Sequence, residues 1–332
     1  MQNLKLHSLL IAICVMVLAC HGQKHFGNEL LSLEKTISLP EVKGRIDHMD
    51  ADVRHRVVFI SALGNNSLEV ASIIQGKLIQ SIKGVSEPQG VGYIPQTNEI
   101  IVANGGNGKC IFYRASDFTP NGSIDLGSDA DDVRYDSVDQ RIYVGYGEGG
   151  IAIIDASKHL KIADIKVPAH PEGFQVDREL GKLFVNVPDA NQIDVIDLKS
   201  QKVTETWKTE YGANFPMAID RKNHVVFVGY RRPGKLVAMD ETNGKTISTI
   251  DLTGDADDLY YDSGAGKIYA SGGSGSVDIF QMENSTLRHV ANIATRSGAR
   301  TSLLIPEIQM FILAERASDG QPAQIRIFST KE

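Results

Sequence analysis

The sequence predicts an all-β chain folded as a seven-bladed β-propeller, and three observations support this fold class. First, an apolar residue, usually aromatic, recurs seven times at intervals of 41 to 43 residues, and self-similarity at such a period is typical of repeat architectures. Second, each of these residues lies in a short run of the β-branched and aromatic residues that favour strands. Third, turn residues divide the repeat into four strand-sized pieces, as in a propeller blade. The recurring positions are Phe59, Ile101, Tyr143, Phe184, Phe227, Tyr269 and Phe311.

The four-strand pattern is clearest in the third repeat. Its strand-sized runs are 131–136, 141–146, 150–155 and 160–167. Gly, Asp and Ser residues between these runs are typical of tight turns. The outer strands that we expect to end the other blades are 77–84, 121–127, 202–208, 245–252 and 288–295.

The seventh repeat ends at the C-terminus without a fourth strand. Residues 33–40 (LEKTISLP) precede the first repeat and resemble the outer strand KTISTIDL of residues 245–252. We therefore expect the N-terminal segment to complete blade seven and close the ring, which would also hide an exposed sheet edge. On this interpretation residues 31–329 form a single domain.

The first 19 residues have the layout of a secretory signal, with an apolar run after Lys5. The run is shorter than the roughly 20 residues that a membrane-spanning helix needs. It ends in Val-Leu-Ala-Cys, which resembles a bacterial lipoprotein signal with Cys20 as the lipidated first residue. Plain cleavage after Ala19 is the alternative. We expect an exported protein, periplasmic or anchored to a membrane only through lipid on Cys20, with residues 20–30 as a tether.

Charge and cysteine content restrict the function further. The chain has 34 Lys and Arg residues against 41 Asp and Glu residues, and this acidic balance argues against a nucleic-acid partner, which needs a basic surface. Of its three cysteines, Cys14 and Cys20 fall in or beside the signal. Cys110 is left alone in a predicted strand, so we expect it to be a buried small apolar residue. A closed ring needs no partner for stability, and we expect a monomer.

The strand pairs of three repeats carry a resemblance to a known family. They read IYVGYGEGGIAIID, LFVNVPDANQIDVID and VFVGYRRPGKLVAMD. These segments resemble the YVTN-type (YncE-like) seven-bladed repeat of exported bacterial proteins, a WD40-like architecture. The resemblance implies that the loops entering each inner strand share one face with the loops between second and third strands, around a central channel. It does not choose a function, because binding proteins and enzymes share this architecture.

Candidate site residues lie at the positions that the resemblance places on this face. Two Asp-Ala-Asp-Asp segments, 129–132 and 255–258, come from blades three and six, which lie roughly opposite in a ring of seven. With His48 they could line the entrance of the channel. The candidate metal ligands are Asp132, Asp258, His170 and Glu172. Carboxylates suit calcium or magnesium, and imidazoles among them would also suit zinc, copper or manganese. The alternative is that these aspartates only cap turns, as Asp136, Asp177, Asp220 and Asp262 are expected to do.

Arginines form the second group of candidates. Arg45, Arg231, Arg232, Arg300 and Arg316 all fall on predicted loops of the same face. Guanidinium groups suit a bidentate carboxylate or phosphate ligand, although a solvated rim or a protein contact would also explain them. The complete set of ligand-binding candidates is His48, Asp131, Asp132, His170, Glu172, Asp257, Asp258, Arg231, Arg300 and Arg316.

No complete catalytic set is visible in the sequence. The segment Gly145-Tyr146-Gly147-Glu148-Gly149-Gly150 fits the dinucleotide-binding pattern but joins two predicted strands, without the helix that would hold a pyrophosphate. We therefore expect a non-catalytic binding scaffold for a protein partner or a small ligand at the channel mouth. The alternative is a metal-dependent hydrolase, lactonase or lyase at the same place. A divalent cation is the one cofactor that these residues suggest.

Overall fold

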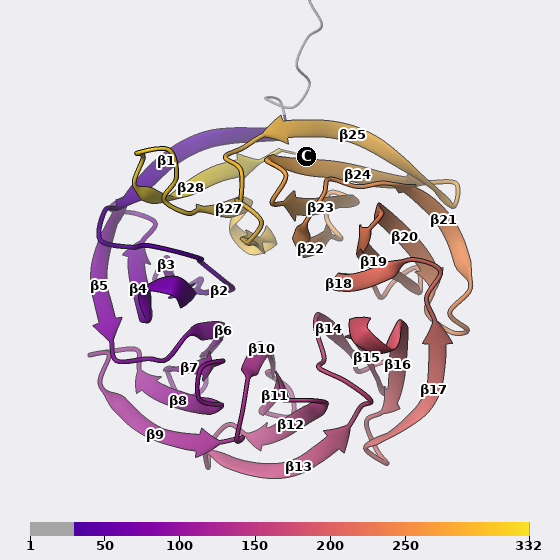
Figure 1. Cartoon of the computed structure of the whole chain (residues 1–332), viewed down its shortest axis with the longest axis horizontal. Helices are drawn as coiled ribbons and strands as arrows, with labels where there is room; N and C mark the ends of the chain where they lie inside the picture. Colours follow the sequence, from indigo (N-terminus) through magenta and orange to yellow (C-terminus); the bar gives the residue numbers. More distant parts are fainter. Residues whose placement is uncertain (1–29, 332) are drawn as a thin grey trace, which may run out of the picture.

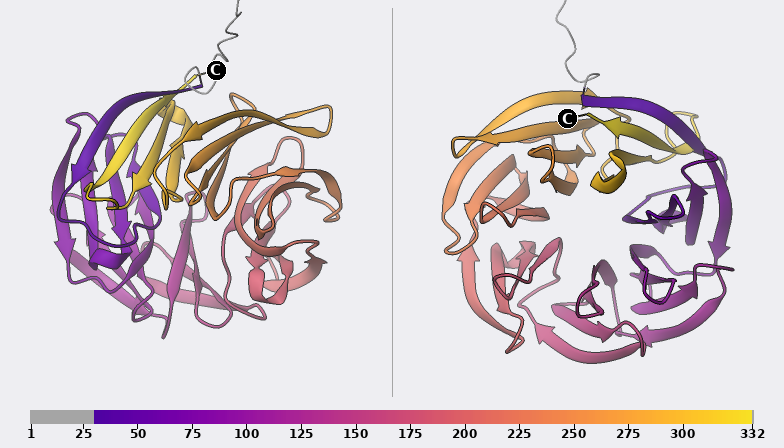
Figure 2. Two further views of the ribbon diagram at one scale, coloured as in Figure 1. Left: turned by 45° about the horizontal axis from the view of Figure 1, so that its top comes forward. Right: turned by 180° about the vertical axis from the view of Figure 1, so that it is seen from behind.

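The computed structural model describes residues 30–331 and confirms the predicted fold. Seven four-stranded antiparallel sheets form a ring around a central channel (Figure 1). The two further views in Figure 2 show the same ring from an oblique angle and from behind. The predicted signal segment, Cys20 and most of the predicted tether lie outside the described residues.

Each blade runs outward from the channel in chain order. Blade one holds β2 (Met49–Asp52), β3 (Val57–Ala62), β4 (Ser67–Ser72) and β5 (Lys77–Lys83). Blade two holds β6 (Pro88–Ile94), β7 (Glu99–Asn104), β8 (Lys109–Arg114) and β9 (Pro120–Asp125). Blade three holds β10 (Ala130–Asp136), β11 (Arg141–Tyr146), β12 (Gly150–Asp155) and β13 (Leu160–Lys166). Blade four holds β14 (Phe174–Asp177), β15 (Lys182–Val187), β16 (Gln192–Asp197) and β17 (Lys202–Lys208).

The remaining blades follow the same order until the chain ends. Blade five holds β18 (Gly212–Asp220), β19 (Val225–Arg232), β20 (Gly234–Asp240) and β21 (Thr246–Asp251). Blade six holds β22 (Ala256–Asp262), β23 (Lys267–Gly272), β24 (Ser276–Glu283) and β25 (Thr286–Ala294). Blade seven holds β26 (Ser302–Ile305), β27 (Met310–Glu315), β28 (Ala323–Thr330) and β1 (Leu31–Leu39). Three short 3₁₀ turns join neighbouring strands. In blades one and four, η1 (Leu63–Asn65) and η2 (Pro188–Ala190) join the second strand to the third, and in blade seven η3 (Pro306–Ile308) joins the first strand to the second.

Burial explains why the second and third strands read as continuous apolar runs. In blade three, β11 and β12 are buried along almost their whole length, because neighbouring blades cover both faces of the sheet. The outer strand β13 is mostly exposed and carries two lysines, which protect a sheet edge from pairing with other chains. The seven recurring apolar residues all lie in second strands and are at most 1% exposed.

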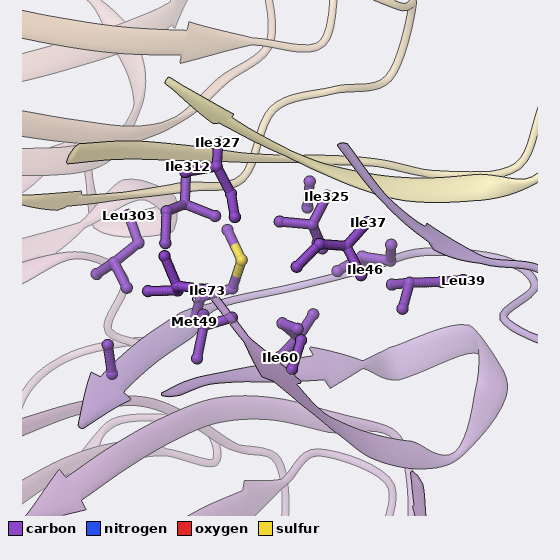
Figure 3. Close-up of a cluster of buried hydrophobic side chains, with 14 of the residues drawn as sticks. Ile37, Leu39, Ile46, Met49, Ile60, Ile73, Leu303, Ile312, Ile325 and Ile327 are labelled. Carbon is purple, nitrogen blue, oxygen red and sulfur yellow. The ribbon is translucent and has the colours of Figure 1, made fainter. Parts of the chain in front are cut away.

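The hydrophobic core is divided into seven clusters, and each joins two neighbouring blades. Tyr269 of blade six stacks on Phe311 of blade seven with ring centroids 5.6 Å apart. The interface between blades seven and one is filled by Ile37 and Leu39 of β1 together with Ile325 of β28 (Figure 3). Every interface between blades therefore buries apolar side chains that would be exposed if the ring opened there.

The N-terminal strand closes the ring, as the sequence predicts. Antiparallel pairing between β1 and β28 runs from Leu31 opposite Thr330 to Leu39 opposite Ala323. The amide of Lys331 also donates a hydrogen bond to the Leu30 carbonyl at 3.1 Å, so the two ends of the described chain meet.

Two further observations concern Cys110 and the search for membrane-spanning helices. Cys110 lies in β8 and is fully buried, and burial raises the pKa of its thiol to about 12. Among residues 30–331, no helix has the length and apolar character needed to cross a membrane.

Candidate functional site

The candidate site is built by equivalent positions of the seven inner strands. Pairing of the inner strand with the recurring residue of the second strand sets a common register, for example Arg134 opposite Tyr143 and Tyr260 opposite Tyr269. In each blade, we take the inner-strand residue that pairs with the recurring apolar residue and count back three residues. The seven residues found in this way are called the first ring. Its members are Asp47, Gln89, Asp131, Glu172, Phe215, Asp257 and Thr301. Four of the seven are carboxylic acids.

The next residue in each blade forms a second ring. Its members are His48, Gly90, Asp132, Gly173, Pro216, Asp258 and Ser302. The strand ladder shifts register at these two rings in blades two, three, five and six. Such β-bulges leave residues outside the regular ladder and re-aim their side chains. Asp131, Asp132 and Asp257 therefore leave the regular strand alternation at the channel, whereas Asp258 still pairs with Ser271.

Close approach between blades explains a glycine in the second ring. A Cβ added to Gly173 would lie 2.6 Å from the Phe215 carbonyl oxygen of the next blade. The Gly173 amide also donates to that carbonyl at 3.1 Å. Blades four and five can meet at the channel only because this position has no side chain.

A cavity of about 370 Å³ opens inside the rings and extends along the inner strands. Its wall includes both charged and aromatic side chains, among them His48, Asp132, Arg134, Glu172, Phe215 and Tyr260. This volume falls within the range of small-molecule sites. The arrangement combines a hollow centre with groups that can bind charge of either sign.

Arginines neutralise the acids on one side of the mouth. Arg231 binds the carboxylate of Asp257 and donates to the Ala256 carbonyl at 2.7 Å, while its guanidinium stacks 3.6 Å from the centre of the Phe215 ring. Arg300 reaches Asp257 at 2.8 Å and Asp255 at 3.0 Å. Deeper in the channel, Arg134 pairs with Asp132. These arginines are partly buried and held by fixed partners.

His48 lies among carboxylates from two other blades. Its Nδ1 is 3.4 Å from Asp258, and its Nε2 is 4.0 Å from both Asp47 and Asp131. Burial disfavours the charged imidazole, but the hydrogen bond to Asp258 and the surrounding negative charges outweigh it and raise the pKa of His48 well above 6.5. Burial likewise raises the pKa of Asp47 to about 7, opposed mainly by the charge of His48.

A second histidine lies between blades three and four. His170 Nδ1 is 2.7 Å from the Gly147 carbonyl, and Nε2 is 3.5 Å from Asp131 Oδ2. Burial opposes protonation of His170, yet Asp131 and the Gly147 carbonyl together raise its pKa to about 9. Burial raises the pKa of Glu172 to about 8, and the charge of Asp131 adds to the shift. Burial and the neighbouring carboxylates thus favour the protonated forms of His170 and Glu172.

The structure brings together most, but not all, of the residues that the sequence singled out. Asp131, His170 and Glu172 offer ligand atoms within 4.8 Å of one another. The set predicted from sequence contained Asp132 and Asp258 in place of Asp131. Asp132 engages Arg134 instead, and Asp258 accepts the Ser302 amide at 2.7 Å besides facing His48. Metal binding at this mouth stays a prediction.

Turn-capping does not account for the Asp-Asp pairs. Within residues 30–331, none of Asp131, Asp132, Asp257 and Asp258 accepts an amide of its own turn. The four aspartates expected at turns do so: Asp136, Asp177, Asp220 and Asp262 accept the amides of Val138, Leu180, Asn223 and Gly264.

The arginine prediction needs a correction. Arg231 and Arg232 belong to β19 rather than to a loop, because pairing with β20 continues to Arg231 opposite Gly234. Arg316 is exposed and lies with Arg45 and Arg300 around a separate hollow of about 130 Å³. Asp50 and Tyr260 of the deeper channel were missed, although both lie at positions equivalent to Arg134 in the repeat.

Comparison with known proteins supports the fold and nothing narrower. No protein-family model matches the chain, and no curated protein matches it. It is similar to a WD40 β-propeller chain in a crystal structure of a mitotic checkpoint complex, with a TM-score of 0.77 at 15% identity, over 100% of this chain and 99% of that one. As many as 1816 chains of solved structures match, so the shape is too widespread to identify an activity.

Proposed function

We propose that this protein is a non-catalytic binding scaffold that recognises a small charged ligand, or a charged segment of a protein partner, in the channel mouth. The cavity of about 370 Å³ behind the first ring carries this proposal. β-Propellers commonly serve as interaction scaffolds, and charged side chains of both signs line this cavity.

The lining suggests the chemistry of the ligand. Arg231 and Phe215 present a guanidinium stacked on an aromatic ring, which suits a planar or anionic group. Glu172, across the same mouth, suits a cationic group or a metal ion. A ligand carrying both charges would complement the cavity better than an apolar one.

Thermal unfolding with a panel of charged small molecules and short peptides tests this function. A ligand present at about 100 times its dissociation constant should add about 2.7 kcal/mol of stability. We expect stabilisation by one class of compound, lost in Phe215→Ala and Arg231→Gln. Arg221→Gln is the matched control, because Arg221 lies in the turn after β18, at the other end of the inner strand. Stabilisation that survives both mouth variants would refute the proposal.

We also propose that the chain belongs among exported YVTN-type propellers and is lipidated on Cys20. The support is the repeat pattern and the Val-Leu-Ala-Cys segment. Labelling of expressing bacterial cells with a palmitate analogue should mark the full chain and not Cys20→Ser. Labelling of neither chain, with removal of residues 1–19 from both, would favour plain cleavage after Ala19.

A metal-dependent hydrolase, lactonase or lyase is the second candidate function. It is favoured by the approach of Asp131, His170 and Glu172, since three protein ligands with an open position are typical of catalytic metal sites. This candidate needs a bound cation before any reaction can be assigned to it.

A further inference from the structure

Three side chains at the boundary of blades three and four form a triangle, which we call the mouth triangle: Asp131, His170 and Glu172. Asp131 comes from the bulged start of β10, and the other two come from the loop between β13 and β14. The Glu172 amide donates to the Asn186 carbonyl at 3.0 Å, which fixes this loop against blade four.

The orientation of His170 points to a ligand. Because a carbonyl oxygen can only accept, Nδ1 must carry the proton in its 2.7 Å contact with Gly147. When a metal ion displaces the other proton, the lone pair is on Nε2, which faces Asp131 Oδ2 at 3.5 Å. Metal-bound histidines are usually held in this way, with the other ring nitrogen donating to a carbonyl or carboxylate. Two atoms bound to one zinc ion at 2.0–2.2 Å lie about 3.4 Å apart in a tetrahedral site.

Glu172 differs from the other acids of the first ring. Asp47, Asp131 and Asp257 each have a basic side chain, arginine or histidine, within 4.0 Å. Among residues 30–331, no side chain or amide hydrogen-bonds or ion-pairs with the Glu172 carboxylate. A partly buried carboxylate without a partner is costly unless something from outside binds it.

A second, independent observation comes from the wall of the same cavity. Asp132 is only 2% exposed, and within the described chain its Oδ2 has no hydrogen-bond partner. Its other oxygen binds Arg134. Asp132 and Glu172 line one cavity, and a buried oxygen without a partner needs a donor, such as a water molecule or a ligand, from that cavity.

We propose that Asp131, His170 and Glu172 bind one borderline first-row divalent cation, such as Zn²⁺ or Mn²⁺, at the mouth of the channel. One imidazole nitrogen and two carboxylates suit these ions, whereas calcium prefers six to eight oxygen ligands. The open side of the ion faces the cavity and would take water or a ligand. The inference rests on the proposed function and specifies how its site binds a negatively charged group.

Calorimetric titration of the chelator-treated mature chain with Zn²⁺ and Mn²⁺, with Ca²⁺ as comparison, tests the site. We expect one equivalent of Zn²⁺ or Mn²⁺ and much weaker binding of Ca²⁺. Glu172→Gln and His170→Gln should each weaken binding by at least about 100-fold, since even residues behind the ligands cost 10–100-fold. Glu172→Gln removes no hydrogen bond of the described chain and relieves the cost of an unpaired charge, so its metal-free unfolding midpoint should not fall.

The control is His55→Gln, which alters another histidine that faces a carboxylate, Asp52 at 2.6 Å. It should bind the metal like the unaltered chain. Absence of binding, or equal binding by both triangle variants, would overturn the inference. Loss in His48→Gln with full binding in Glu172→Gln would do so too, because it would place the ion deeper in the channel.

The small-molecule experiment, run with and without chelator, separates this inference from the proposed function. A ligand that still stabilises the metal-free chain through Phe215 and Arg231 would leave the scaffold function standing when the metal inference fails. Metal binding without stabilisation by any ligand would leave the metal inference standing when the scaffold function fails.

Discussion

At the scale of single residues, the same position of the repeat carries very different chemistry from blade to blade. Asp258 accepts the buried Ser302 amide of the next blade at 2.7 Å, and so joins blades six and seven. Its equivalent in blade four is Gly173, where a neighbouring carbonyl leaves no room for a side chain. Some residues of a ring therefore have a structural role, and others are available for binding. Experiments must distinguish these two groups.

Asp258→Ala should destabilise the protein even if nothing binds at the mouth. It leaves the Ser302 amide without a partner in a buried place, which costs about 1–3 kcal/mol. Chemical denaturation should show a lower midpoint than for Asp251→Ala, which removes an 88% exposed carboxylate. Equal midpoints would mean that the Ser302 hydrogen bond contributes nothing to stability.

A buried acid cluster outside the mouth predicts a pH effect on stability. Burial raises the pKa of Glu241 to about 7, and the nearby Asp177 carboxyl adds to the shift while His224 at 3.2 Å opposes it. Below the usual carboxyl pKa both states are protonated. Between pH 4.5 and 7 only the unfolded chain ionises at this residue, so stability falls as pH rises, by at most about 3 kcal/mol.

Glu241→Gln tests this effect, because the amide cannot ionise and can still donate to Asp177. Its free energy of unfolding should fall less than that of the unaltered chain between pH 4.5 and 7. The control is Glu179→Gln, an exposed residue of the turn that follows β14. Parallel pH curves for all three chains would count against a raised Glu241 pKa.

At the scale of elements, the strand β1 closes the ring and also contributes to the hydrophobic core. Ile37 and Leu39 are at most 1% exposed, although they lie at the beginning of the chain, because they fill the interface of blades seven and one (Figure 3). Leu33 of the same strand is 49% exposed. One strand thus contains both a core position and a matched surface position.

Ile37→Ala should cost about 2–5 kcal/mol, since it removes a buried side chain and leaves a cavity. Leu33→Ala should change stability by less than about 0.5 kcal/mol. Deletion of residues 31–41 should abolish cooperative unfolding, because β28 would keep only β27 as a partner and the interface of blades seven and one would lose Ile37 and Leu39. Chemical denaturation measures all three, and a similar midpoint for Ile37→Ala and Leu33→Ala would contradict the closure by β1.

At the scale of the whole molecule, the two ends of the described chain meet in blade seven, which is built from residues 31–39 and 302–330. Hydrogen bonds between β1 and β28 therefore close the ring in the way that a short covalent link would. The remaining six blades are each continuous in sequence. The stability of the ring should therefore depend on whether the two chain ends lie within one blade or at a boundary between blades.

Circular permutation tests this dependence. With a short linker from Lys331 to Leu30, a chain opened at the exposed turn of Ser157 and Lys158 still builds one blade from both ends, and should unfold within a few degrees of the native chain. A chain opened between Gly127 and Ser128, at a blade boundary, lacks such a shared sheet. We expect it to unfold at a clearly lower temperature, and equal midpoints would show that shared pairing is not what holds the ring.

The sequence by itself determined the period, the strand order and the closing strand. These features are local: turn residues, strand propensity and burial of second-strand residues such as Tyr143 repeat in every blade, and residues 33–40 resemble other outer strands. Tertiary structure alone decided the partners at the mouth. Asp131 and Asp132 are neighbours in sequence, yet a bulge in β10 turns one toward His170 and the other toward Arg134. Which carboxylate meets which cation depends on how adjacent blades are rotated around the channel, and no pattern within one repeat contains that information.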